Sequence, residues 1–563
     1  MKTVWGEKLQ ADCVLQEYPR PQMRRESYVN LNGLWDYAIT EQEEEPLQWQ
    51  GKILVPFSPE CELSGVGRIL RPEQTLWYRR SFPAVQAQRV LLHFGAVDQM
   101  AEVFINGTLA GSHTGGYTAF TLDITHLLQE ENTLLVKVRD LSDSGDCAWG
   151  KQRRKRGGIW YTPQSGIWQT VWLEPVPKVY IKNILAVPSY DTEEICITVF
   201  SDEDVPCRIK LDGICCEGMT NSVICAALPC FRPWSPEEPF LYTFTAELAE
   251  DRVESYFALR KVEVLEDEHG IPRIFLNNRP YFMNGLLDQG YWSDGMYTAP
   301  SDEALIFDIQ TMKDMGFNLL RKHIKIEPMR WYYHCDRLGM LVWQDMPNGG
   351  GPYRFMTISA PLVTKRHRKD DDYKSFARES LWGREQYGKE LEEMILQLRN
   401  VPSVVLWCPF NEGWGQFDAK RVVEKIRKLD DTRLIDHASG WHDQGIGCLQ
   451  SLHVYFTKYR FKRDKKGRAV VLSEYGGYNY MEPGHSFGKN FGYRKLKDKD
   501  ALLKRFESLM LEQILPARQQ GLAAAVYTQL SDVEDEVNGL VSYDRKVVKL
   551  PVAAVRDINW RLR

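Results

Sequence analysis

The stretch from Asn318 to Trp343, NLLRKHIKIEPMRWYYHCDRLGMLVW, indicates the fold of the C-terminal half of the chain. Short apolar runs at residues 317–322 and 340–344 predict strands, and the amphipathic segment at 327–338 between them predicts a helix. A strand, a helix and a second strand in this order are typical of a parallel βαβ unit. The stretch therefore predicts α/β architecture.

The same alternation extends in both directions from this unit. Ser301 precedes an amphipathic segment and is expected to cap a helix there. Eight strands with helices between most of them predict a (β/α)8 TIM barrel over residues 266–563. The expected strands cover 281–287, 317–322, 340–344, 403–407, 433–436, 449–455, 469–473 and 523–529, and the expected helices cover 302–315, 327–338, 387–398, 417–429 and 501–514.

The part of the chain before the predicted barrel has a different pattern of apolar and polar residues. Short alternating apolar runs separated by Gly, Asn, Asp and Pro predict β-structure, with a hairpin turn at Asn106-Gly107. We expect a jelly-roll β-sandwich over residues 1–177 and a small immunoglobulin-like β-sandwich over residues 178–265. A chain of 563 residues is too long for one hydrophobic core, so this multidomain organisation is expected.

Composition and charge narrow the class of protein. A net charge of −5 does not favour nucleic acid or an anionic membrane as a partner. The basic run KQRRKR at residues 151–156 precedes two glycines and is interpreted as a solvated loop. We find neither a signal peptide nor a membrane helix in the sequence, and the twelve cysteines lack paired C-x-x-C spacing. A cytoplasmic protein with reduced, mostly buried thiols and no zinc is expected.

Two glutamates end apolar runs in the predicted barrel. Glu412 follows SVVLWCPFN and Glu474 follows AVVLS, which places them after the fourth and seventh strands, at facing positions across the barrel. Glycoside hydrolysis needs two such carboxylates, one protonated and one ionised. Phe410 and Trp414 are expected to raise the pKa of Glu412, the acid. The alternative for each glutamate is a structural salt bridge, and Arg321, Tyr455 or Tyr475 is expected to hold Glu474 ionised.

Several motifs resemble glycoside hydrolase family 2 over nearly the whole chain. RNVPSVVLWCPFNE at residues 399–412 is similar to the acid/base signature of the family, and SEYGG at residues 473–477 to its nucleophile strand. The stretch 318–343 resembles a second signature, and residues 94–125 resemble the sugar-binding jelly roll. The resemblance implies a retaining mechanism with Glu412 as acid/base, Glu474 as nucleophile and Asn411 as a sugar ligand.

Further candidates for substrate binding lie at strand ends or beside the glutamates. Trp441 has loop packing as its alternative role, and Asp532 is as suited to capping a helix as to substrate contact. The loop 348–375 is expected to be a lid or a disordered segment, and its place on the C-terminal face of the barrel would let it rim the pocket. The full set of candidate substrate-binding residues is Asn411, Asp288, Arg321, His323, Trp414, His453, Tyr455, Trp441 and Gln529.

The sequence departs from the family at places that bear on the sugar. The segment KHIKIEP at 322–328 replaces the usual Ser-His-Tyr-Pro stretch, putting His323 and Lys325 where substrate contacts are expected. The Asn-x-Lys motif by which β-glucuronidases hold a carboxylate is not evident. The magnesium-binding pattern of large β-galactosidases is not evident either, so no metal is expected, and no cofactor is expected.

These features predict an exo-β-glycosidase. A β-galactosidase is the first expectation for the sugar, with β-glucuronidase, β-mannosidase and arabinosidase as alternatives. A non-catalytic carbohydrate-binding protein and a partner-binding scaffold are the competing functions. The expected partner is a carbohydrate or glycoside, and the resemblance is compatible with a homo-oligomer.

Overall fold

A computed structural model describes residues 1–211, 213–364 and 367–563. The first part of the chain forms a β-sandwich, because its strands bury alternate side chains, as in β7 (Met100–Ile105). Trp35, Tyr78 and Phe94 meet in the core between the two sheets. One sheet has the order β3 (Gly51–Val55), β2 (Gly33–Thr40), β4 (Thr75–Pro83), β10 (Glu131–Arg139), β7, β8 (Thr108–Thr114), and the other β1 (Val29–Asn30), β12 (Val171–Val176), β5 (Arg89–Phe94), β9 (Phe120–Asp123).

The predicted hairpin turn at Asn106-Gly107 is confirmed. It joins β7 to β8, and both turn residues have positive φ, 52° for Asn106 and 80° for Gly107. Glycine adopts this conformation freely and asparagine tolerates it, which is why the pair favours a two-residue turn here.

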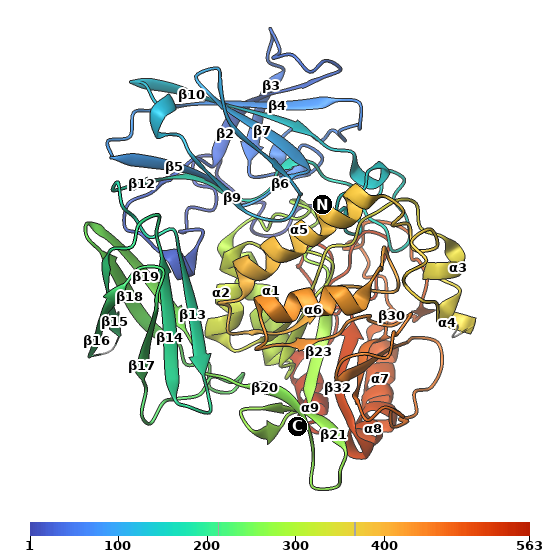
Figure 1. The fold of residues 1–563 in the computed structure, drawn as a ribbon. Helices are drawn as coiled ribbons and strands as arrows, with labels where there is room; N and C mark the ends of the chain where they lie inside the picture. The colour runs from blue at the N-terminus through green and yellow to red at the C-terminus, as the bar shows by residue number, and fades with distance from the viewer. Residues whose placement is uncertain (212, 365–366) are drawn as a thin grey trace.

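A second, smaller β-sandwich follows (Figure 1). Ile197 and Phe244, from opposite sheets, are both buried in its core. Its arrangement is consistent with the expected immunoglobulin-like unit. One sheet contains β13 (Asn183–Ser189), β14 (Glu194–Phe200) and β17 (Val223–Ala227), and the other β16 (Ile214–Met219), β15 (Pro206–Leu211), β18 (Tyr242–Leu248) and β19 (Asp251–Phe257).

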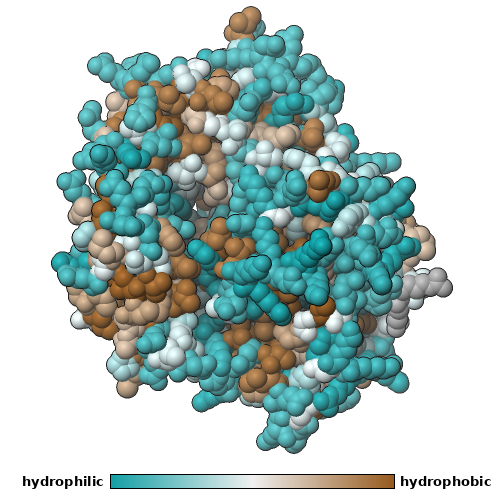
Figure 2. Space-filling view, viewed as in Figure 1, coloured by the Kyte–Doolittle hydropathy of each residue, from teal (hydrophilic) through white to brown (hydrophobic). Residues whose placement is uncertain are grey.

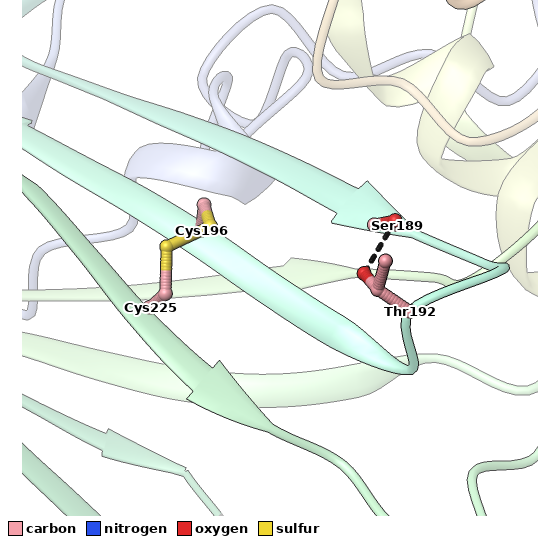
Figure 3. Close-up of a disulfide and its surroundings, with 4 residues drawn as sticks. All are labelled: Ser189, Thr192, Cys196 and Cys225. Carbon is pink, nitrogen blue, oxygen red and sulfur yellow. Dashed lines mark hydrogen bonds between the residues drawn. A yellow bond between two sulfur atoms is a disulfide. The ribbon is translucent and has the colours of Figure 1, made fainter.

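The expectation of reduced thiols throughout is wrong at one pair. Cys196 on β14 and Cys225 on β17 are direct partners in the strand register and form a disulfide (Figure 3). Directly opposite positions on antiparallel strands bring the two Cβ atoms close enough for a bond, which cysteine spacing alone does not reveal. The other ten cysteines are free, and five of them are buried, namely Cys61, Cys147, Cys207, Cys335 and Cys408.

The C-terminal part is a nearly closed barrel of eight parallel strands, as predicted. All eight strands predicted from the alternation lie in one sheet. The two strands at its open edges are the two-residue strand β27 and the strand β28. In order they are β27 (Leu434–Ile435), β26 (Val404–Cys408), β25 (Leu341–Asp345), β24 (Leu319–Lys322), β23 (Met283–Asp288), β32 (Leu522–Thr528), β29 (Ala469–Gly476) and β28 (Leu449–Val454).

Helices surround the barrel, with bounds close to those expected. Ser301 caps α1 by accepting a hydrogen bond from the backbone N–H of Ala304. The helix α5 begins six residues earlier than expected because Ser380 provides a cap there. The main helices are α1 (Asp302–Asp314), α2 (Met329–Leu338), α5 (Leu381–Leu398), α6 (Ala419–Leu429), α7 (Lys499–Leu509), which continues through η5 (Met510–Ile514) into α8 (Leu515–Gln520), and α9 (Val552–Trp560).

The outward face of the barrel helices is mostly hydrophilic where Figure 1 places α5 and α6 (Figure 2). Among the described residues, no helix combines the length and apolar character that crossing a bilayer requires. The expected loop at 348–375 contains α3 (Phe355–Ile358) and α4 (Pro361–Thr364), and its residues 365 and 366 lie outside the described part of the chain.

A segment of the N-terminal sandwich reaches the barrel. The backbone N–H groups of Trp149 and Gly150 both donate to the carbonyl oxygen of Asn348, at 2.9 and 3.0 Å. Thr118 donates to Glu393 on α5 at 2.8 Å. The N-terminal sandwich therefore packs on the barrel and takes part in building the surroundings of its C-terminal end.

Candidate active site

The two glutamates come from the strands predicted for them. Glu412 lies in the loop after β26, the fourth barrel strand in chain order, and Glu474 lies on β29, the seventh. The backbone of Glu412 has a φ of 50°, and its N–H donates to the carbonyl oxygen of Ser439 at 2.9 Å. This bond holds the loop to the segment after β27, so the position of Glu412 depends on a contact outside its own strand.

His453, at the end of β28, lies between the two carboxylates. Its Nδ1 is 2.8 Å from Oε1 of Glu412, and its Nε2 is 3.6 Å from Oε1 of Glu474. Ligating atoms of the three side chains all lie within 4.8 Å of one another. This spacing suits two carboxylates acting on one sugar carbon. The same three groups could also hold a cation, so the expected absence of a metal stays a prediction.

Glu474 lies in an environment that favours its ionised form. Burial by itself would raise its pKa, but electrostatic interactions with His453 and with the Arg321 cation hold the pKa below the ordinary value. Arg321 donates from Nη1 to Oε1 of Glu474 at 3.2 Å, and Tyr455 donates its hydroxyl hydrogen to Oε2. The carboxylate is therefore charged and held in one orientation.

Glu412 has the opposite tendency. Burial raises its pKa, the hydrogen bond and charge of His453 lower it, and the negative charge of Glu474 raises it further, with a net shift upward. Its side chain is 14% exposed and that of Glu474 is 6% exposed. Two neighbouring carboxyl groups with pKa values displaced in opposite directions are equipped for an acid and a base role.

Arg321 connects the two halves of the site. Its Nε and Nη2 donate to the two carboxylate oxygens of Asp345, both at 3.0 Å, and Nη2 also donates to Oδ1 of Asn411 at 2.8 Å. His323 lies 2.7 Å from Asp345, and burial holds the pKa of this histidine well below its ordinary value. The ring of His323 is therefore neutral, and Arg321 is the cation that orients Glu474 and Asn411.

Two buried donors beside Glu412 have no hydrogen-bond partner among the described residues: Nδ2 of Asn411 and Nε1 of Trp414. Both residues are 2% exposed. A buried N–H without a partner is costly, so these donors are suited to the hydroxyl groups of a bound ligand.

Trp441 also lies at the site. Its ring centroid is 5.4 Å from that of His453, and its indole N–H donates to the carbonyl oxygen of Ile358 at 3.0 Å. The hydrogen bond to Ile358 uses the only polar atom of the Trp441 side chain for loop packing, the alternative role considered for this residue. Any contact with a ligand is left to its ring.

Four of the residues considered as ligand contacts are bonded to other protein groups. Asp288 accepts a hydrogen bond from Lys322 at 2.6 Å, and Gln529 bonds to Asn538 at 2.8 Å. Lys325 is fully buried and donates to Glu327 at 2.8 Å. Asp532 pairs with Lys549 at 2.6 Å rather than capping a helix. Their ligand roles stay predictions without a contact that supports them.

Other groups near the pair were missed in the sequence. Lys151 was interpreted as part of a solvated loop, but it is 4% exposed and its Nζ lies 6.0 Å from the ring centroid of Trp414. It pairs with Glu536 at 3.4 Å, and that carboxylate also accepts hydrogen bonds from Tyr161 and Tyr493. These residues come from three distant segments, so no local pattern connects them.

Two facing carboxylates with displaced pKa values, at the C-terminal end of a (β/α)8 barrel, define the class of glycoside-hydrolase-type barrels. Comparison with family models agrees. Residues 270–545 match the family 2 glycosyl hydrolase TIM barrel domain, and residues 47–158 match the galactose-binding domain-like unit of the same family. The chain belongs to glycoside hydrolase family 2.

Curated relatives are distant in sequence. A β-galactosidase of Thermoanaerobacter pseudethanolicus is 25% identical over 448 residues, which are 72% of this chain and 54% of that protein. A protein of Formosa agariphila named as a putative β-glucuronidase is 26% identical over 447 residues, covering 72% and 51%. The chain thus spans about half the length of these two relatives.

Solved structures share the fold over nearly the full chain. The β-D-glucuronidase of Dictyoglomus thermophilum has a TM-score of 0.74 at 17% identity, covering 97% of this chain and 98% of that one. A family 2 β-galacturonidase of Eisenbergiella tayi bound to galacturonate has a TM-score of 0.71 at 19% identity, covering 97% and 99%. At such identities the likeness concerns the fold alone.

Proposed function

We propose that the chain is a retaining exo-β-glycosidase in which Glu474 is the nucleophile and Glu412 the acid/base. The observation that carries the proposal is that the two carboxyl groups lie within 4.8 Å of one another with pKa values displaced in opposite directions. Retaining enzymes place these groups roughly 5–5.5 Å apart, and inverting enzymes need roughly 6.5–9.5 Å to admit a water between them. The observed spacing supports retention.

The reaction proceeds in two displacements. Glu474 attacks the anomeric carbon with a carboxylate oxygen while Glu412 gives its proton to the glycosidic oxygen, so the C–O bond breaks and the leaving group departs as an alcohol. Glu412, now ionised, takes a proton from water, and the resulting nucleophile attacks the same carbon and releases Glu474. Two inversions at one carbon give a sugar with its original configuration.

Low exposure of the pair supports attack at a chain end. With 14% and 6% of their side-chain surfaces exposed, the carboxyl groups lie in a closed site that suits a terminal sugar better than the interior of a polysaccharide. The charges nearby support a neutral sugar. Arg321 is paired with Asp345 and Glu474, and Lys151 with Glu536. A uronic acid would bring a carboxylate to a site whose cations are already neutralised, so a neutral sugar is favoured. Among neutral sugars a β-galactoside is the first candidate, because the relatives of the chain include a β-galactosidase.

A panel of nitrophenyl glycosides tests the activity, with β-galactoside, β-glucuronide, β-mannoside and α-arabinoside as its members. We expect release of nitrophenol from the β-galactoside above all. Binding of a sugar without turnover of any member would favour the non-catalytic carbohydrate-binding alternative.

Azide rescue tests the two roles. In Glu474→Ala we expect turnover to fall by about three orders of magnitude or more and azide to restore it with a glycosyl azide of inverted configuration. In Glu412→Ala the azide product should retain the configuration, because the covalent intermediate still forms. Glu424→Ala, at an exposed site on α6, is the control. Identical products from both glutamate variants would contradict the assignment.

Two further expectations belong to this proposal. The domain boundaries at 177/178 and 265/266 are proposed from the change of pattern along the sequence, and limited proteolysis followed by mass spectrometry would locate them.

A cytoplasmic location is proposed on the sequence alone, and fractionation of the cells that produce the protein would test it.

A further inference from the structure

An aromatic cluster extends outward from Glu412 and ends at an arginine. Trp414, two residues after Glu412, packs against Trp160 with ring centroids 5.0 Å apart. Trp149 lies 5.5 Å from Trp160, and Tyr353 lies 5.0 Å from Trp149 and 6.0 Å from Trp160. Trp149 and Trp414 are buried, whereas Trp160 and Tyr353 are half-buried and so offer surface to a ligand. We call these four residues the aromatic cluster.

The position of the aromatic cluster relative to Glu412 indicates what the cluster binds, and this step rests on the proposed function. The residue that protonates the glycosidic oxygen must face the leaving group, since that oxygen departs with it. Trp414 also lies beside the site itself, with its ring centroid 6.1 Å from that of His323. The cluster therefore begins beside the reacting bond and continues where a leaving group would lie. Flat aromatic faces are suited to stacking on sugar or aromatic rings.

Arg153 lies over the aromatic cluster, and its positive charge is not part of an ion pair among the described residues. Its guanidinium carbon lies 4.0 Å from the ring centroid of Trp160, 5.6 Å from that of Trp149 and 5.9 Å from that of Tyr353. No acidic group of the described chain lies within ion-pair distance of it. Three of the four other cations of the same run are paired: Lys151 with Glu536, Arg154 with Asp143 and Arg156 with Glu534.

A half-buried, unpaired guanidinium that lies over an indole ring has N–H donors available to a ligand. A guanidinium over an aromatic ring uses its face there, and the N–H donors in its plane match a carboxylate or sulfate in geometry. Partial burial strengthens the attraction, because water screens the charge less than at an open surface.

We propose that Arg153 and the aromatic cluster form the leaving-group subsite and that it selects a ring carrying an anionic substituent. The terminal sugar stays neutral, whereas the residue to which it is linked contributes the negative charge. The substrate class is thus a neutral sugar joined to an acidic sugar or an acidic phenol.

A matched pair of glycosides tests this. Both carry the sugar selected by the nitrophenyl panel, one on 4-hydroxybenzoate and the other on its neutral methyl ester. We expect kcat/KM to favour the acidic phenol by about fivefold to tenfold at low salt, with the preference decreasing as salt screens the pair. In Arg153→Gln the preference should fall to about one through a loss on the acidic substrate alone. Arg154→Gln, next in sequence and already paired with Asp143, should keep it.

The outcomes separate a binding role from a packing role. Equal losses on both glycosides in Arg153→Gln would overturn the proposal and assign Arg153 to packing, as would a wild-type protein without preference. Arg153→Lys keeps the charge and should retain part of the preference. Calorimetric binding of both glycosides to Glu474→Ala gives the same comparison without turnover. If no glycoside of the panel is cleaved, the proposed function itself fails, which is distinct from cleavage without preference.

Discussion

His453 Nδ1 lies 2.8 Å from Oε1 of Glu412. The same ring presents Nε2 to Oγ of Ser439 at 3.0 Å, so both nitrogens have partners and the ring orientation is fixed. Because the imidazole contacts both carboxyl groups of the pair, it acts on the pKa of each and lowers both. The histidine therefore couples the two groups that the proposed reaction requires in different protonation states.

The pH dependence of kcat/KM should be bell-shaped. The proposed reaction needs Glu474 ionised and Glu412 protonated. The pKa of Glu474 is lowered and that of Glu412 is raised, so the rate falls at acidic pH through protonation of Glu474 and at basic pH through deprotonation of Glu412. Glu412→Gln, assayed on an activated aryl glycoside, should lose the basic limb and keep the acidic one. A basic limb that persists in this variant would contradict the role of Glu412.

Asn411 should contribute mainly to the transition state. Its Nδ2 donor is buried without a partner among the described residues, and Arg321 holds its Oδ1 in place. A bond from this donor to the sugar 2-hydroxyl should strengthen as the reaction proceeds, so Asn411→Ala should lower kcat/KM by about a hundredfold. The 2-deoxy glycoside serves as the control. Additive losses from the variant and the 2-deoxy substrate would show that the two groups do not interact.

Asp302 should stabilise the fold at neutral pH. Burial alone would raise its pKa, but hydrogen bonds from His334 and Arg330 and their charges hold it at about 2, against an ordinary 3.8. A lowered carboxyl pKa contributes stability above the unfolded-state value, and this contribution is lost as the pH falls from about 4 toward about 2. Asp302→Asn should cost about 2 kcal/mol of unfolding free energy near neutral pH.

Urea unfolding of wild type and Asp302→Asn at several pH values measures this contribution. The difference between the two proteins should narrow in acid. Glu303→Gln, an exposed neighbour on the same helical turn, is the control and should change little. A difference that stays constant between neutral and acidic pH would show that Asp302 acts by packing alone.

Thiol counting should detect the disulfide. Cys196 and Cys225 are bonded and the remaining ten cysteines are free. Protein denatured without reductant should therefore take up ten alkyl groups, and reduced protein twelve. Mass spectrometry of the intact chain gives both numbers, and Cys196→Ser should label at Cys225 without reduction. Twelve labels before reduction would restore the original expectation of free thiols throughout.

Much of the fold was predictable because it depends on local pattern. The alternation of apolar runs and amphipathic segments located all eight barrel strands, since buried parallel strands and surface helices impose different periods on the chain. Asn106-Gly107 fixed a hairpin and Ser301 a helix start through the conformations and hydrogen bonds of those residues alone. Helix ends were less certain, as α5 shows, because a cap at Ser380 lies outside the apolar pattern.

The sequence by itself determined the barrel, the two glutamates and the strands that carry them. Only the tertiary structure decided that His453 lies between the carboxyl groups and that Lys151 is buried instead of solvated. It also decided among the three residues expected to hold Glu474: Arg321 and Tyr455 bond to it, whereas the Tyr475 hydroxyl bonds to Met510. Strand identity follows from periodicity along the chain. Contacts between segments hundreds of residues apart, and the burial that displaces a pKa, depend on how the domains pack, and no local spacing encodes that.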